Sequence, residues 1–294
     1  MAISNPNMFD ENVEFAGIKL KVDPINRKRT DQSDNVMAVF YEEQPFTWEF
    51  SKPYIAKALQ DSNGSIDFLD IGCGSGVFSI LVSKHFPGSK VIALDKSARA
   101  IEQAQENAKL NDVRFEVKHE LYSEDSFPPK SAKVIGLYPP YHLYPEAIRD
   151  KIPQHARGGS DGQDEFKNQL QIANHHLADG GVIFFNQMCL GDDKDPAFAR
   201  YIGKYIDGNP SVVYTNVFPA MSTEDFLRGV YGEKHPDYVK KTAEETPMVY
   251  YNVGIIRRDS KGEIKEVPHS VDLRGRSWDD RIKLHYEIAQ HEYK

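Results

Sequence analysis

Three glycines at alternate positions, Gly72, Gly74 and Gly76, follow Asp70 in the stretch FLDIGCGSGVFSILVSK. The apolar run before these residues predicts a strand, and the amphipathic pattern after them predicts a helix. Residues without a β-carbon let a ligand approach the main chain, and the start of a helix offers unpaired N–H groups. The stretch therefore predicts a binding site for a small polar ligand.

The spacing excludes the two common phosphate-binding loops. A dinucleotide fingerprint needs its third glycine where this chain has Val77, and a P-loop needs Gly-Lys-Ser or Gly-Lys-Thr, which the stretch lacks. The carboxylate of Asp70 repels a pyrophosphate and attracts an ammonium group. We therefore expect a cationic ligand with a nucleoside, and Val77 disfavours the alternative of a nicotinamide-dependent oxidoreductase.

Asp95 ends the next predicted strand, 19 positions after Gly76. An acidic residue at about 20 positions from such a glycine turn reaches the ribose hydroxyls in βαβ units. The alternative role of Asp95 is to cap the helix that follows. Because the glycine turn is also present, ribose binding is the favoured interpretation.

Together these features resemble the cofactor motifs of class I S-adenosylmethionine-dependent methyltransferases. The resemblance covers roughly residues 40 to 257. It implies S-adenosylmethionine as the cofactor. The residues expected to contact this cofactor are Asp70, Gly72, Cys73, Gly74, Gly76, Asp95, Lys96, Glu120, Leu121 and Tyr138.

Glu120 and Leu121 enter that set because of their position after the third strand of the predicted sheet. Members of the family place an acidic residue there that accepts a hydrogen bond from the adenine amino group, followed by an apolar residue that packs on the ring. Both residues match in type. The alternative is that they are solvated loop residues.

The motif Tyr138-Pro139-Pro140-Tyr141 bears on the methyl acceptor. It resembles the Asn-Pro-Pro-Tyr motif of amino-methyltransferases, and Gly-Gly-Ser-Asp-Gly at 158–162 resembles the glutamine methyltransferases that modify release factors. In that family the Asn side chain and the next carbonyl accept hydrogen bonds from the nitrogen to be methylated. Tyr138 replaces this Asn. A phenol prefers to donate hydrogen bonds, so the pair of acceptors that would hold an amide nitrogen is weakened.

We therefore expect Tyr138, Pro139 and Tyr141 to form the transfer site in a different way. Tyr138 orients a hydroxyl or carboxylate acceptor or forms the floor under the methionine part of the cofactor, and Tyr141 offers its ring face. The alternative is that the motif is only a rigid turn. His142, Glu146 and His155 are candidate general bases, interpreted as surface residues of the following loop.

The expected reaction is methyl transfer to a nitrogen or oxygen atom, with a small molecule favoured over a protein side chain and RNA placed last. A net charge of -8 disfavours tight binding to a phosphate backbone. Two basic clusters, Arg27-Lys28-Arg29 and the one formed by Arg274, Arg276, Arg281 and Lys283, are interpreted as solvated charge. The alternative function is a non-catalytic S-adenosylmethionine- or nucleoside-binding protein with a degenerate transfer site.

Strands and helices alternate along the chain, which predicts an α/β fold with a parallel, doubly wound sheet. Strands are expected at 68–71, 90–94, 114–118, 132–137, 182–186, 211–218 and 248–256, and helices at 77–85, 98–110, 165–177, 196–206 and 223–231. The resemblance implies a Rossmann-like, seven-stranded methyltransferase sheet with helices on both faces. It also implies a last, antiparallel strand inserted between the fifth and the sixth.

The chain is expected to have three parts. Residues 1–50 are an N-terminal extension over the cofactor pocket, in which 46–48 either close the pocket or anchor the leading helix. Residues 51–257 are the methyltransferase domain. Residues 258–294 are a hairpin arm and an amphipathic helical tail. The two cysteines lack metal-ligand spacing, so no metal is expected. The sequence has neither a leader-like start nor a long apolar stretch, which predicts a cytoplasmic protein without a membrane partner.

Overall fold

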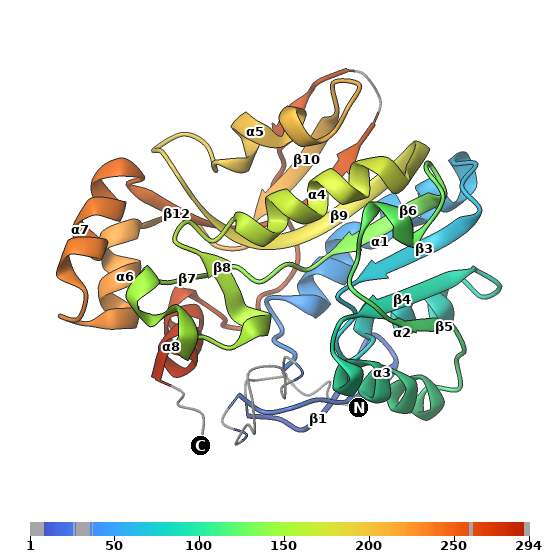
Figure 1. The fold of residues 1–294 in the computed structure, drawn as a ribbon, viewed down its shortest axis with the longest axis horizontal. Helices are drawn as coiled ribbons and strands as arrows, with labels where there is room; N and C mark the ends of the chain where they lie inside the picture. The colour runs from blue at the N-terminus through green and yellow to red at the C-terminus, as the bar shows by residue number, and fades with distance from the viewer. Residues whose placement is uncertain (1–8, 26, 28–35, 37, 259–260, 291–294) are drawn as a thin grey trace.

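A computed structural model describes residues 9–25, 27, 36, 38–258 and 261–290 of the chain. One mixed sheet runs through it in the strand order β13-β10-β12-β9-β6-β3-β4-β5, with β11 paired to β12 (Figure 1). The strands of this sheet are β3 (Ile66–Ile71), β4 (Val91–Asp95), β5 (Glu116–His119), β6 (Ala132–Leu137), β9 (Leu177–Gly191), β10 (Ser211–Asn216), β11 (Met221–Ser222), β12 (Met248–Arg257) and β13 (Ile264–Glu266). Two short pairs lie outside it, β1 (Asn12–Phe15) with β2 (Ile18–Lys21) and β7 (His142–Leu143) with β8 (Arg157–Gly159).

The topology confirms the predicted doubly wound sheet. Strands β3, β4, β5, β6 and β9 are parallel, and β12 is inserted antiparallel between β9 and β10. The predicted hairpin arm after residue 258 is wrong, because β13 pairs in parallel with β10 and not with β12. Both edges of β12 are already occupied by β9 and β10, so a strand that follows β12 has to pair farther out.

The helices are α1 (Gln44–Asp61), α2 (Val77–His85), α3 (Ala98–Leu110), α4 (Asp164–His176), α5 (Phe198–Tyr205), α6 (Thr223–Tyr231), α7 (Pro236–Glu245) and α8 (Trp278–Gln290), with 3-10 turns η1 (Glu124–Ser126), η2 (Glu146–Lys151) and η3 (Gln154–Ala156). The bounds of α2 and α3 are those expected from the sequence. Ser97 caps α3, since its hydroxyl accepts a hydrogen bond from the backbone N–H of Ala100 at 3.3 Å. The expected boundary between residues 50 and 51 lies inside α1.

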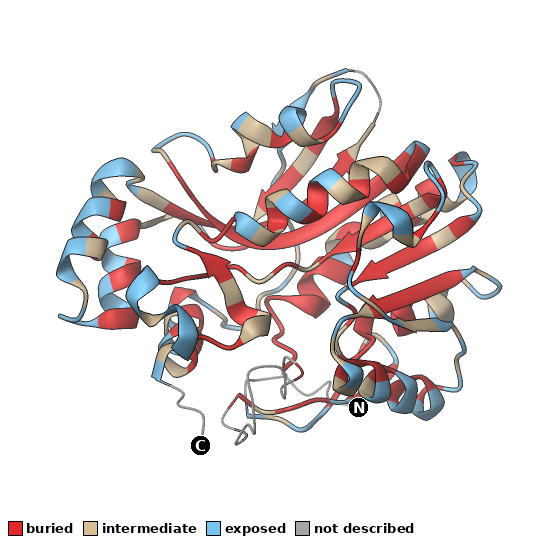
Figure 2. Cartoon of the chain, viewed as in Figure 1, coloured by how far each residue is buried: buried red, intermediate tan, exposed pale blue. Residues whose placement is uncertain are grey.

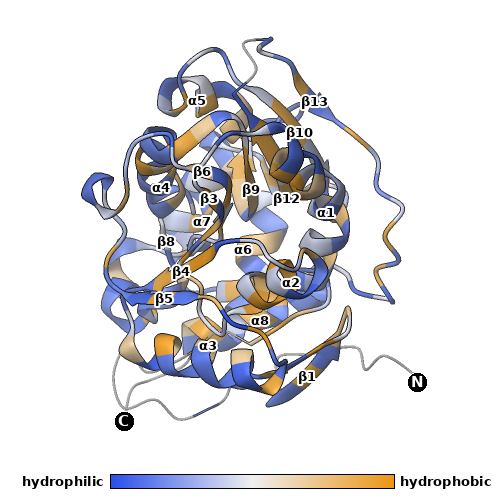
Figure 3. Ribbon diagram, turned by 90° about the vertical axis from the view of Figure 1, so that its right-hand side faces the viewer, coloured by the Kyte–Doolittle hydropathy of each residue, from blue (hydrophilic) through white to orange (hydrophobic). Residues whose placement is uncertain are grey.

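Two apolar cores lie on opposite faces of the sheet, as the period of two in its strands requires. Phe68 and Phe184 face the core that α1 and α2 cover, whereas Leu69 and Phe185 face the core that α4 and α5 cover. Figure 2 shows the strands buried almost throughout. The two edge strands β5 and β13 are exceptions, and the hydrophilic residues of β5 are visible in Figure 3.

A third group of helices, α6, α7 and α8, gathers beyond the ends of β9 and β12 (Figure 1). Phe226 of α6 and Trp278 of α8 pack on each other there, with ring centroids 5.8 Å apart. In α1, Phe46 and Trp48 are fully buried and act as anchors of the helix. Among the described residues no helix is both long enough and apolar enough to cross a membrane.

Candidate active site at the carboxyl edge of the sheet

A cavity of about 510 Å³ lies where the central parallel strands end. Register brings the ends of these strands level, because Ile71 pairs with Leu94 on one side and with Leu137 on the other. The chain leaves the sheet in opposite directions on the two sides of β3, and ligands of open α/β sheets bind at such a switch point. The cavity is therefore in the place that the fold favours for a ligand.

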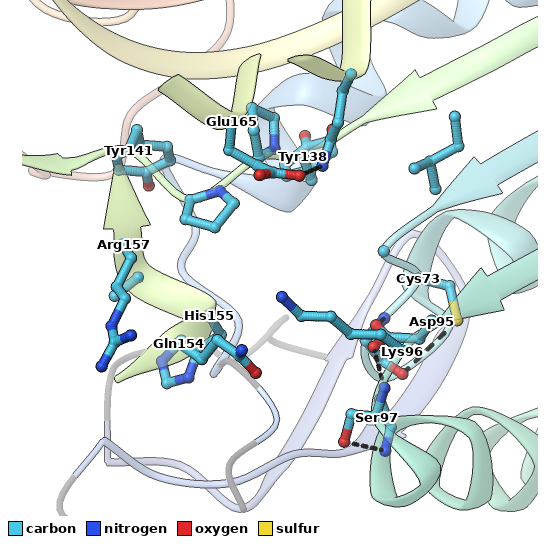
Figure 4. A pocket seen from close by; sticks show the side chains of 18 of the residues that line it. Cys73, Asp95, Lys96, Ser97, Tyr138, Tyr141, Gln154, His155, Arg157 and Glu165 are labelled. Carbon is cyan, nitrogen blue, oxygen red and sulfur yellow. Dashed lines mark hydrogen bonds between the residues drawn. The ribbon is translucent and has the colours of Figure 1, made fainter. Parts of the chain in front are cut away.

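Most of the predicted site residues meet in this cavity (Figure 4). The residues that line it are Asp70, Gly72, Cys73, Gly74, Asp95, Lys96, Glu120, Leu121, Tyr138, Pro139 and Tyr141. Gly76 lies behind the wall, where an added β-carbon would be 3.1 Å from the β-carbon of Ala104. The missing β-carbon of Gly76 thus allows α2 to pack closely against α3, and the expected cofactor contact of Gly76 stays a prediction.

One wall, here called the glycine side, consists of Asp70, Gly72, Gly74, Asp95, Glu120 and Leu121. Gly72 and Gly74 have positive φ values of 67° and 53°, and an added β-carbon on Gly72 would meet no atom within 4 Å. The main chain is thus open to a ligand. The Asp95 carboxylate accepts hydrogen bonds from the N–H of Gly74 at 3.0 Å and of Ser97 at 2.9 Å. These bonds fix its direction and leave lone pairs for a ligand.

Asp70 carries a second carboxyl group, which is almost completely buried on the glycine side. Its Oδ2 atom accepts hydrogen bonds from the backbone N–H of Ser79 at 3.0 Å and from the Ser79 hydroxyl at 2.6 Å. Burial raises the pKa of Asp70 to about 6, although both of these bonds oppose the rise. Asp70 is therefore ionised at neutral pH and able to hold a cation.

Glu120 and Leu121 offer complementary surfaces to a heteroaromatic ring. The Oε1 atom of Glu120 is buried and has no hydrogen-bond partner among the described residues. Leu121 lies beside it with 69% of its surface exposed. An N–H donor attached to a flat apolar ring satisfies both, because the donor reaches the carboxylate and the ring covers the leucine. These residues fit the adenine group of S-adenosylmethionine.

Tyr138 belongs to the wall through its ring. The ring stacks on Phe78 of α2 with centroids 4.6 Å apart and meets Phe184 edge-on at 6.3 Å. Burial raises the pKa of Tyr138 well above its ordinary value, and its hydroxyl has no hydrogen-bond partner among the described residues. The phenol stays protonated at neutral pH, so Tyr138 does not act as a base here.

Tyr141 is fixed in the opposite wall by two hydrogen bonds of its hydroxyl. Its hydroxyl donates to Oε2 of Glu43 at 2.9 Å and accepts from Nη1 of Arg281, also at 2.9 Å. The same Nη1 atom donates to Glu43 at 2.9 Å. Because these partners use the hydroxyl, Tyr141 presents its ring and backbone to the cavity. We call this group of three residues, Glu43, Tyr141 and Arg281, the clamp.

Arg281 comes from α8 and has no exposed surface. Its guanidinium also pairs with Glu42 at 3.2 Å and lies over the rings of Phe40 and Tyr251. Arg276 is largely buried as well and pairs with Asp280 at 3.0 Å. The interpretation of these two arginines as solvated charge is therefore wrong; they hold the C-terminal helix in place.

Other members of the two basic clusters have different surroundings. Arg274 lies over the ring of Tyr41 at 4.1 Å, and Lys283 is exposed on α8. Arg27 pairs with Asp23 at 3.6 Å. The remaining members of the first cluster, at 28 and 29, lie outside the described residues.

The Gly-Gly-Ser-Asp-Gly segment at 158–162 supports Tyr141 from behind. An added β-carbon on Gly158 would lie 2.6 Å from both the Cα and the carbonyl carbon of Tyr141. The backbone of β8 can approach Tyr141 this closely only because residue 158 is glycine.

Gly158→Ala is therefore expected to push the Tyr141 backbone aside and to lower the free energy of unfolding by about 1–3 kcal/mol. Gly203→Ala is the matched control, because Gly203 lies exposed in α5 with no atom within 4 Å of an added β-carbon. This control should gain about 0.5–1 kcal/mol from the helix propensity of alanine. Urea unfolding of both variants tests the argument, and equal stabilities would contradict it.

Several lining residues were missing from the set expected from sequence. Glu43 and Gln44 come from the start of α1, and Leu284, His285 and Ile288 come from α8. His155 and Arg157 complete the left wall in Figure 4, opposite Asp95 and Lys96. Together with Tyr141 and His142, the α8 residues form what we call the helix side of the cavity.

The candidate bases His142 and Glu146 were both expected at the surface, and the structure confirms this only for Glu146. His142, expected at the surface, is 1% exposed. Glu146 is exposed and pairs with Arg149 at 3.2 Å. The sequence does contain one signal for the helix side. Arg281 and His285 share a face of α8 with the buried residues Trp278, Leu284 and Ile288, and polar residues on an otherwise apolar helical face indicate buried polar contacts.

Comparisons with known proteins bear on the family of this chain. Residues 54–185 match the model of the methyltransferase small domain. The chain is 31% identical over 189 residues to a putative protein N5-glutamine methyltransferase of Methanocaldococcus jannaschii, an alignment that covers 62% of this chain and 82% of that protein. It is 31% identical over 169 residues to a release factor glutamine methyltransferase of Homo sapiens, covering 53% of this chain and 48% of that one.

The chain spans about half the length of the human relative and of a second release factor glutamine methyltransferase, from Thermodesulfovibrio yellowstonii. Among solved structures, a tRNA (uracil-54, C5)-methyltransferase of Pyrococcus abyssi in complex with S-adenosyl-L-homocysteine matches with a TM-score of 0.41 and 18% identity, covering 84% of this chain and 44% of that one. The M. jannaschii relative is matched over most of its length, and the strand order and the glycine turn agree with the family. The chain therefore belongs to the class I S-adenosylmethionine-dependent methyltransferases.

Proposed function

We propose that this protein transfers a methyl group from S-adenosylmethionine to a nitrogen or oxygen atom of a small molecule. The observation that carries the proposal is a single cavity in which the glycine side faces a second wall built from Tyr141, His142 and α8. One wall suits the methyl donor, and the other is available to an acceptor. Both reactants thus fit in one space, which methyl transfer requires.

The glycine side supplies a partner for each part of the donor. Asp70 suits the ammonium group, Asp95 suits the ribose hydroxyls, and Glu120 with Leu121 suits adenine. When bound, S-adenosylmethionine supplies a methyl group that is already activated by its sulfonium sulfur. The protein therefore has to orient the acceptor, exclude water and hold both reactants in contact.

The helix side favours a small acceptor. Its residues come from segments of this chain that are themselves buried, among them His142 and His285, each 1% exposed. The chain's own C-terminal helix thus covers the space beside Tyr141. Tyr138 in place of the Asn of the related motif also removes an amide-accepting group, which argues against a glutamine side chain.

A protein glutamine side chain is the second candidate acceptor. It is favoured by the relatives, which are named as glutamine methyltransferases and are 31% identical to this chain. The Gly-Gly-Ser-Asp-Gly segment and the proline pair are consistent with it. The two candidates differ in the size of the labelled product.

Methyl-labelled S-adenosylmethionine, incubated with the protein and a cell extract, tests the proposal. Label in the low-molecular-weight fraction supports a small acceptor, and label in protein supports the second candidate. Binding of S-adenosylhomocysteine in calorimetry without any labelled product on a broad acceptor panel contradicts the enzymatic proposal and supports a non-catalytic binding protein. Tight binding of NAD in place of S-adenosylhomocysteine contradicts both the methyltransferase proposal and the non-catalytic alternative.

Affinity for S-adenosylhomocysteine is expected to depend on pH through Asp70. Because burial raises the pKa of Asp70 from 3.8 to about 6, the carboxyl group is neutral below that value and anionic above it. Binding of the ligand's ammonium group should weaken as the pH falls below about 6 and stay constant between about 7 and 8. Calorimetry across this range measures the effect. In Asp70→Asn the affinity at neutral pH should be low and the step near pH 6 absent; a step that persists in this variant belongs to another group.

A further inference from the structure

A chain of four groups on the helix side contains two buried histidines whose proton positions can be assigned. The Nδ1 atoms of His142 and His285 lie 2.6 Å apart, so one of them donates a hydrogen bond and the other accepts it. The Nε2 atom of His142 lies 3.3 Å from the Tyr231 hydroxyl. That hydroxyl lies 2.5 Å from the backbone carbonyl oxygen of Leu143.

The assignment starts at the carbonyl end. A carbonyl oxygen only accepts, so the hydroxyl hydrogen of Tyr231 lies between the oxygen atoms of Tyr231 and Leu143. The Tyr231 oxygen then accepts from Nε2 of His142, which carries the hydrogen. Both histidines are neutral, because burial lowers the pKa of His142 to about 3 and that of His285 well below its ordinary value, with the charge of Arg281 adding to the effect on His285.

A neutral imidazole carries one hydrogen. Since the hydrogen of His142 is on Nε2, its Nδ1 atom is the acceptor, and His285 donates from Nδ1. The Nε2 atom of His285 is therefore an unprotonated acceptor. It is buried and has no hydrogen-bond partner in the part of the chain that the structure describes.

His285 lines the cavity next to Tyr141, on which its ring stacks at 6.1 Å with an interplanar angle of 28°. Phe226 closes another side of the ring at 5.3 Å. A buried acceptor without a partner is unfavourable unless water or a ligand satisfies it. The cavity is the space from which such a donor can come.

We propose that Nε2 of His285 accepts a hydrogen bond from the N–H or O–H group of the methyl acceptor and so aims the acceptor atom toward the donor. This proposal rests on the proposed function. It makes His285, on α8, a substrate-binding residue. It also assigns the acceptor to the class of molecules that carry a hydrogen on the nitrogen or oxygen to be methylated. In the transfer the acceptor atom bonds to the methyl carbon as the bond from that carbon to the sulfonium sulfur breaks, which releases S-adenosylhomocysteine, and the hydrogen of the acceptor atom departs as a proton to solvent water. His285 takes no proton, because an imidazole that is so weakly basic is a poor proton acceptor but still a hydrogen-bond acceptor.

Nitrogen NMR of the histidine side chains tests the assignment directly, without a substrate. At neutral pH, Nδ1 of His285 and Nε2 of His142 should show the shifts of protonated nitrogen, and Nε2 of His285 the shift of an unprotonated one. Tyr231→Phe is the internal control, because it frees Nε2 of His142 from its acceptor while leaving His285 in place. A protonated Nε2 on His285 in the unmodified protein overturns the proposal.

Transfer of label from S-adenosylmethionine to cell-extract acceptors tests the role. His285→Phe keeps a flat ring and should lower the transfer rate about tenfold, the loss of one hydrogen bond, while His285→Gln restores part of the rate through its carbonyl oxygen. The dissociation constant of S-adenosylhomocysteine should stay within about twofold in both variants, because His285 lies outside the glycine side. Full activity in His285→Phe, or an equal loss in both variants, contradicts the proposal. If the unmodified protein labels nothing, the proposed function fails, and the NMR result still decides the assignment.

Discussion

Replacing Arg281 by methionine is expected to lower the free energy of unfolding by about 3–5 kcal/mol. Methionine fills much of the space but leaves Glu43 and two tyrosine hydroxyls buried without the guanidinium donor. Glu42 loses one of its two arginine partners and keeps Arg276 at 3.5 Å. Burial already raises the pKa of Glu43, and the charge of Arg281 is the largest effect that opposes this rise. Without the arginine the carboxylate is a buried charge that has lost its partner. Urea unfolding followed by fluorescence measures the loss.

Lys283→Met is the matched control, since Lys283 lies two residues away on α8 and is exposed. Its effect should remain within about 0.5 kcal/mol. The double variant Glu43→Gln/Arg281→Met removes both charges of the pair, so it should be more stable than Arg281→Met alone. A single variant as stable as the control would mean that the clamp contributes nothing to the fold.

Asp95→Ala is expected to weaken the binding of S-adenosylhomocysteine by about 10- to 100-fold. The variant loses a carboxylate that is already oriented by the N–H groups of Gly74 and Ser97, and a hydrogen bond to a charged group contributes about 1.5–3 kcal/mol. It also leaves the N–H of Gly74 without its acceptor, which loosens the glycine turn. Calorimetry with S-adenosylhomocysteine gives the dissociation constant.

Asp125→Ala serves as the control for this variant, because Asp125 is an exposed aspartate in η1, outside the cavity. Its affinity for S-adenosylhomocysteine should equal that of the unmodified protein. Unchanged affinity in Asp95→Ala would show that the ribose hydroxyls find their acceptors elsewhere.

The glycine side could be predicted from the sequence because its signals are local. Each of its residues lies at, or a few positions after, the carboxyl end of a strand, and parallel strands bring their carboxyl ends to one edge whatever the details of the packing. Asp70, Asp95 and Glu120 could therefore be placed together before any contact was known. Spacing does not tell which of the three glycines also makes room for a neighbouring helix, as Gly76 does beside Ala104.

The helix side could not be predicted in this way, since it depends on contacts between distant segments. The pattern of α8 indicates an amphipathic helix. The charged residues on such a helix can lie at the surface or form buried ion pairs, and the sequence does not distinguish the two until the partners are known. The partners of Arg281 are Glu42 and Glu43, which precede α1. Nothing near residue 281 in the sequence points to them.

Two further errors have local causes. The turn signal at 259–262 favours a hairpin, but a strand can fold back only where its neighbour has a free edge, and β12 has none. Helix α7 was missed because only Val239 and Thr242 of its ten residues are buried, too few to produce a helical period in the sequence.

The clamp joins Glu43 and Arg281, which are 238 positions apart. During synthesis on the ribosome the glycine turn, Asp95 and Tyr141 all leave the exit tunnel well before α8 does. At about 5–20 residues per second, the interval between Tyr141 and Arg281 lasts roughly 7–28 seconds. Throughout this interval Tyr141 lacks its arginine, Glu43 lacks its counter-charge, and the apolar faces that α8 covers are open. The nascent chain thus has the glycine side early and the helix side late, so its uncovered apolar surface is prone to aggregation until α8 has been made.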